Sequence, residues 1–79
     1  MKCITIFENT HPRNDDEHTW DIHAGMSQNH LLTTFDFEDR DAAVEWAKRN
    51  ADKTVMLREA TVGGYDQKWT LSGLTWDEE

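Results

Sequence analysis

The strongest constraint on this fold is one helical pattern set among segments that alternate like strands. Residues 36–50 place acidic side chains at the start and basic side chains at the end, which suits the helix dipole. Along the same segment runs an apolar stripe at helical spacing, made of Ala43, Val44, Trp46, Ala47 and Ala51. The pattern predicts a helix that buries this stripe.

Five other segments read as strands: 2–8, 18–24, 31–37, 54–62 and 67–76, the last with a bulge at Gly73. The first has apolar side chains on both faces, which is typical of an interior strand. A turn over 25–29 predicts an antiparallel hairpin, and Gly63-Gly64 predicts a second turn. The order strand–strand–strand–helix–strand–strand predicts an α+β, two-layer domain, in which one helix covers an antiparallel sheet of about five strands.

The length of 79 residues predicts a single domain over 1–79, with 77–79 fraying as an acidic tail. Four Trp, three Phe and one Tyr supply much of the core that so short a chain needs. Cys3 is the only cysteine, so no intrachain disulfide forms, and we expect a cytoplasmic protein, in the bacterial host if phage-encoded. We expect no membrane association, because no apolar run approaches the ~20 residues of a span.

The net charge of the chain limits the classes of molecule that it can bind. Sixteen acidic residues against eight basic ones give a formal charge of −8. A field of this sign repels nucleic acid and anionic membrane and attracts basic proteins. We therefore expect no direct contact with nucleic acid, and a partner that is a basic, nucleic-acid-binding protein or complex. The oligomeric state is left open between monomer and homodimer.

Ten of the sixteen acidic residues form three clusters. One lies along the predicted helix, where Glu38, Asp41 and Glu45 share a solvated face and are the first candidates for partner contact. The alternative is that these acids, with Asp39, only compensate the helix dipole. A second cluster, also a candidate contact, is Asp15, Asp16 and Glu17, and a third is formed by residues 77–79.

The sequence offers no catalytic or metal-binding constellation. His11, His18, His23 and His30 lack the spacing of a zinc motif, and no serine or cysteine lies in a nucleophile motif. We therefore expect no metal, no cofactor and no enzymatic activity, with a small enzyme kept as a third possibility. Trp69 and Trp76, near the C-terminus, are candidates for an apolar interface.

The chain resembles two known groups of proteins, and each resemblance implies something about its fold or function. Residues 33–47, TTFDFEDRDAAVEWA, resemble the strand-to-helix joint of integrase arm and AP2-type domains, which implies a similar fold. DNA binding is not implied, because the outward positions of the second and third predicted strands carry no Lys or Arg. In size, acidity and architecture the chain also resembles the small phage-encoded inhibitors of host defence, of which anti-CRISPR proteins are the best-known group.

Together these observations predict a non-enzymatic inhibitor that occupies a basic nucleic-acid-binding groove. The second resemblance implies a CRISPR effector complex, blocked from its target DNA, as the partner. The alternative is an antitoxin or phage accessory interaction module that acts through an apolar, aromatic surface.

Overall fold

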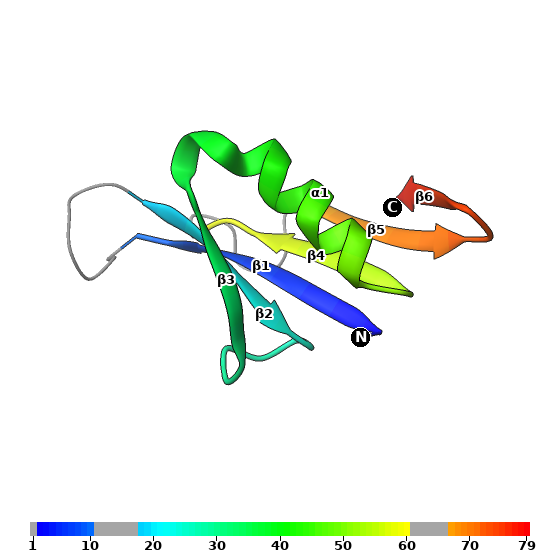
Figure 1. Cartoon of the computed structure of the whole chain (residues 1–79), viewed down its shortest axis with the longest axis horizontal. Helices are drawn as coiled ribbons and strands as arrows, with labels where there is room; N and C mark the ends of the chain where they lie inside the picture. Colours follow the sequence, from blue (N-terminus) through cyan, green and yellow to red (C-terminus); the bar gives the residue numbers. More distant parts are fainter. Residues whose placement is uncertain (1, 11–17, 61–66) are drawn as a thin grey trace.

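A mixed sheet and a helix packed across one of its faces make up the fold. The computed structural model describes residues 2–10, 18–60 and 67–79, and within these ranges it has six strands in the order β3-β2-β1-β4-β5-β6 (Figure 1). The strands are β1 (Cys3–Asn9), β2 (Thr19–Ala24), β3 (Leu31–Asp36), β4 (Thr54–Arg58), β5 (Gln67–Ser72) and β6 (Thr75–Glu78). A 3-10 turn η1 (Phe37–Asp39) leads into the helix α1 (Arg40–Asn50).

The α+β class with one helix over a sheet is confirmed, but the sheet is not wholly antiparallel. β1 pairs antiparallel with β2 and parallel with β4. The cause is the helical connection between β3 and β4, which crosses over β2 and β1 before the chain re-enters the sheet. A crossover of this kind places the strands that it joins in the same direction. As expected from its two apolar faces, β1 is an interior strand.

The C-terminal segment differs from the prediction. Residues 67–76 are not one bulged strand, because β5 and β6 form a hairpin around Gly73 and Leu74. Gly73 has a φ of 65°, which a type II′ turn requires at its first central residue and which glycine adopts without steric cost. The acidic tail expected over 77–79 overlaps β6, which reaches Glu78, and the backbone N–H of Glu79 donates to the Lys68 carbonyl. The Gly63-Gly64 turn lies outside the described residues.

The main core lies between α1 and the sheet. The predicted stripe is buried at Ala43, Val44, Ala47 and Ala51, and Trp46 is half-buried against the same core. The small alanine side chains let the helix lie close to the strands, which contribute Ile4, Ile6, Trp20, Ile22, Val55, Leu57 and Trp69. The helical segment was expected from residue 36, but α1 begins at Arg40 after the 3-10 turn.

The opposite face of the sheet also has buried side chains. Thr5, Phe7 and Met56 alternate along β1 and β4 with the residues that face α1, and all three are less than 9% exposed. His23 on β2 is buried on the same face. The loop after β2 lies over this side, since the Thr5 hydroxyl donates to the Gly25 carbonyl at 2.6 Å.

Candidate functional site

The outer side of α1 presents the first candidate contact residues. Asp41 and Glu45 lie one turn apart on the exposed side of the helix, opposite Ala43 and Ala47. The Asp41 carboxylate is fully exposed, and its ion pair with Arg40 is long, at 3.9 Å between Nη1 and Oδ1. Glu38 is exposed too, but it lies in η1 and not on α1. We call Glu38, Asp41 and Glu45 the acidic row.

The stability of α1 explains the negative charge of only some members of the acidic row. Glu38 and Asp41 lie at the N-terminal end, where negative charge compensates the helix dipole. Glu45 lies in the middle of α1, and Asp41 four residues earlier carries the same charge. The nearby Lys48 places its Nζ 4.9 Å from the centre of the Trp69 ring. Glu45 is therefore the member of the row whose charge the dipole does not explain.

The acids near the C-terminus do not join the row as a group. On the helix side of the sheet, the Glu78 carboxylate accepts a hydrogen bond from Gln67 Nε2 at 2.8 Å. Asp77 and Glu79 alternate to the other side, where Glu79 accepts from the Thr70 hydroxyl and lies 3.8 Å from Lys68 Nζ. The tail charge is thus divided between the two faces. Asp15, Asp16 and Glu17 lie outside the described residues.

The aromatic candidates occupy different environments. Trp69 is 8% exposed and belongs to the core beneath α1, which leaves little of its ring for a partner. Trp76 is half-buried, packed against the same core and opposite Leu71 on β5. Leu74, at the turn of the hairpin, is 99% exposed. The fully exposed apolar side chain of this hairpin is therefore Leu74, while Trp76 is only partly accessible.

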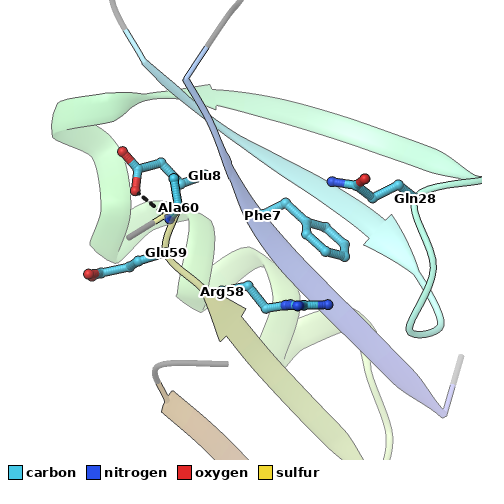
Figure 2. Close-up of a pocket in the computed structure, with 6 residues that line it drawn as sticks. All are labelled: Phe7, Glu8, Gln28, Arg58, Glu59 and Ala60. Atoms are coloured by element: carbon cyan, nitrogen blue, oxygen red, sulfur yellow. Dashed lines mark hydrogen bonds between the residues drawn. The ribbon is translucent and has the colours of Figure 1, made fainter. Parts of the chain in front are cut away.

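Sequence reasoning missed the hollowed face opposite α1. One hollow on this face has a volume of about 250 Å³. In Figure 2 the Arg58 side chain extends alongside Phe7, and Gln28 approaches from the loop after β2. The Arg58 guanidinium lies 5.6 Å from the centre of the Phe7 ring. Glu8, on the other side of β1, accepts the backbone N–H of Ala60 at 3.0 Å (Figure 2). A second hollow of about 300 Å³ lies on the same face, among lysine and methionine side chains.

His23 is a buried titratable group on this face. Its ring packs edge-on against Phe7 with 5.2 Å between centroids, and its Nδ1 has no hydrogen-bond partner among the residues that the structure describes. Burial lowers the pKa of His23 below its usual value, and the Asp21 carboxylate offsets part of that shift. The ring is therefore neutral at pH 7.

His23 should make folding stability depend on pH. Below about 6.5 the unfolded chain takes up a proton at this histidine while the folded protein resists it, so the free energy of unfolding falls as the pH drops towards the lowered pKa. Well above pH 6.5 His23 is neutral in both the folded and the unfolded chain, so it adds no pH dependence to the free energy of unfolding. Urea denaturation between pH 7.5 and 5 should show a shallower decline for His23→Gln than for the parent protein. His30→Gln, at an exposed position, is the control, and an equal effect of both substitutions would contradict this account.

No three His, Cys, Asp or Glu side chains within residues 2–10, 18–60 and 67–79 come together as a metal site would require. No helix among those residues has the length and apolar character needed to cross a membrane.

Comparison of the chain with protein-family models, curated proteins and solved structures found no match.

Proposed function

We propose that this protein is a non-enzymatic inhibitor that places the acidic row in a basic nucleic-acid-binding groove of its partner and so excludes DNA. The observation that carries the proposal is the exposure of Asp41 and Glu45, side by side on α1, with the charge of Glu45 left unexplained by the dipole. Carboxylates one helical turn apart are roughly 5–6 Å from one another at Cβ. That spacing is comparable with the phosphates of one DNA strand, so the row can occupy cationic positions that otherwise hold a backbone.

The partner class follows from the resemblance to phage-encoded inhibitors. A CRISPR effector complex holds its nucleic acids in a positively charged channel. An acidic protein would be steered towards such a channel, and the field raises the association rate more than the final affinity. The net charge of −8 supports this proposal. The acidic row identifies the surface of the protein that would face the groove.

Competition for target DNA tests the proposal. A purified CRISPR effector complex, first identified by pulldown from host lysate, is mixed with labelled target DNA and increasing amounts of the protein. We expect DNA occupancy to fall as the protein is added. We also expect the affinity of the protein for the effector complex, measured without DNA, to weaken steeply between 50 and 300 mM salt, because screening weakens exposed charge pairs. An affinity that does not change with salt would rule out electrostatic mimicry.

The exposed Leu74 favours one alternative, in which an antitoxin or phage accessory module binds its partner through the β5–β6 hairpin. Leu74→Ser changes no charge and removes no core contact, so it separates the two proposals. Loss of inhibition in Leu74→Ser with normal folding would favour the hairpin, and unchanged inhibition would favour the acidic row.

A further inference from the structure

A hollow of about 300 Å³ on the sheet face away from α1 has the features of a ligand site. Three lysines, Lys2, Lys53 and Lys68, surround it, and its apolar lining comes from Cys3, Met26 and Met56. The volume is at the lower end of the range for small-molecule pockets, which runs from roughly 300 to 1,000 Å³. It therefore fits a small ligand, or one end of a longer one.

The charge of this hollow is opposite to that of the whole molecule. Three of the eight basic residues gather here in a chain with a net charge of −8. They come from three places, just before β1, just before β4 and within β5, and the pairing of β4 with both neighbours brings them together. In the described part of the chain, neither Lys2 nor Lys53 forms an ion pair, so their mutual repulsion is left for a bound anion to relieve.

A carboxylate already lies beside the third lysine. Glu79 Oε1 is 3.8 Å from Lys68 Nζ, and the Glu79 side chain also accepts from the Thr70 hydroxyl. This contact shows that an anionic group can reach Lys68 from the end of β6. It also means that Glu79 would compete with a ligand for Lys68.

The apolar lining is suited to an alkyl chain. Met56 is 4% exposed and Met26 is 68% exposed, so one methionine is fixed in the sheet and the other projects from the loop after β2. Methionine side chains are unbranched and polarizable, and they adapt to ligands of differing shape. A group that covered Met26 would remove its exposed apolar surface from water.

We propose that this hollow binds a small amphiphilic anion, in which a carboxylate lies among the three lysines and an alkyl chain packs against Met26 and Met56. The acidic row lies on the other side of the sheet, so the proposal stands independently of the inhibitor function. The ligand class follows from charge complementarity to the lysines and from the apolar lining.

Three eight-carbon probes with different head groups test the charge preference. Octanoate, octanol and octylammonium are titrated into the full-length protein at low salt, below the concentrations at which they form micelles. The field of the whole molecule favours the cation, whereas the hollow favours the anion, so we expect octanoate to bind most tightly. Methionine methyl NMR should show saturable shifts of Met26 and Met56. Preferential binding of octylammonium, or no saturation with octanoate, would overturn the proposal.

Charge-neutralising variants locate the site. Lys53→Gln should weaken octanoate binding about two- to five-fold, the range expected from loss of one exposed ion pair. Glu79→Gln should strengthen binding, because the competing carboxylate is removed. The matched controls are Lys48→Gln, beside Trp69 on the helix side, and Glu78→Gln, bonded to Gln67 on that side. Equal effects of Lys53→Gln and Lys48→Gln would show only a dependence on net charge and would overturn the proposal.

Discussion

Replacing Trp20 by alanine is expected to remove a large part of the folding stability of this protein. The side chain is 2% exposed, its ring stacks on Phe37 with 5.2 Å between centroids, and its Nε1–H donates to the Phe37 carbonyl at 2.8 Å. A buried Trp→Ala change costs about 3–5 kcal/mol. A chain of this length has a free energy of unfolding of roughly 4–12 kcal/mol in total. The loss is therefore between about a quarter and the whole of this free energy.

Urea denaturation followed by far-ultraviolet circular dichroism measures this effect without relying on tryptophan emission. Trp46→Ala is the comparison, because Trp46 is half-buried at the edge of the same core and should cost less. Trp20→Phe should recover part of the stability, since it restores an aromatic ring but not the N–H donor. A smaller shift for Trp20→Ala than for Trp46→Ala would contradict the assignment of Trp20 to the centre of the core.

The double substitution Asp41→Lys/Glu45→Lys is expected to lower the association rate with the partner by on the order of 10- to 100-fold at low salt, because it removes steering towards a basic groove. Both side chains are exposed, so Glu45→Lys should alter the free energy of unfolding by no more than about 0.5 kcal/mol. Asp41→Lys places a positive charge in the first turn of α1 and should lower it by about 0.5–2 kcal/mol, because the charge then opposes the helix dipole. Surface plasmon resonance against the effector complex gives the rate, and thermal denaturation checks the folding.

A matched single reversal separates the acidic row from net charge. Glu45→Lys and Asp77→Lys both change the charge by two units, but Asp77 lies on β6 and points to the face away from α1. We expect Glu45→Lys to slow association markedly and Asp77→Lys to slow it only slightly. Equal slowing would mean that total charge, and not the helix surface, determines binding.

Local patterns were enough to predict the helix and the β2–β3 hairpin, because both depend on residues close in sequence. The parallel pairing of β1 with β4 was missed, since it joins segments about fifty residues apart and no local signal reports it. At Gly73 the sequence was ambiguous for a physical reason. A one-residue bulge and a two-residue turn each shift the alternation of side chains by one position. Either feature therefore places Leu71 and Trp76 on the same face of the sheet.

The candidate sites were predictable to different degrees. The spacing of Asp41 and Glu45 placed them together on α1, whereas Glu38 fell in the 3-10 turn, whose start the helical pattern does not mark. The lysine-lined hollow was not foreseen, because Lys2, Lys53 and Lys68 become neighbours only once the strand order is known. A sequence signal does exist: Met56 and Lys68 occupy positions that alternate with core residues on their strands.

The acids of β6 have a consequence for solubility. β6 is an edge strand, and the outer row of backbone groups on an edge is a template for adding a strand from another molecule. Asp77 and Glu78 lie in this strand, and both are exposed. Two such edges cannot approach without bringing like charges together, so these acidic side chains disfavour growth of the sheet into an aggregate.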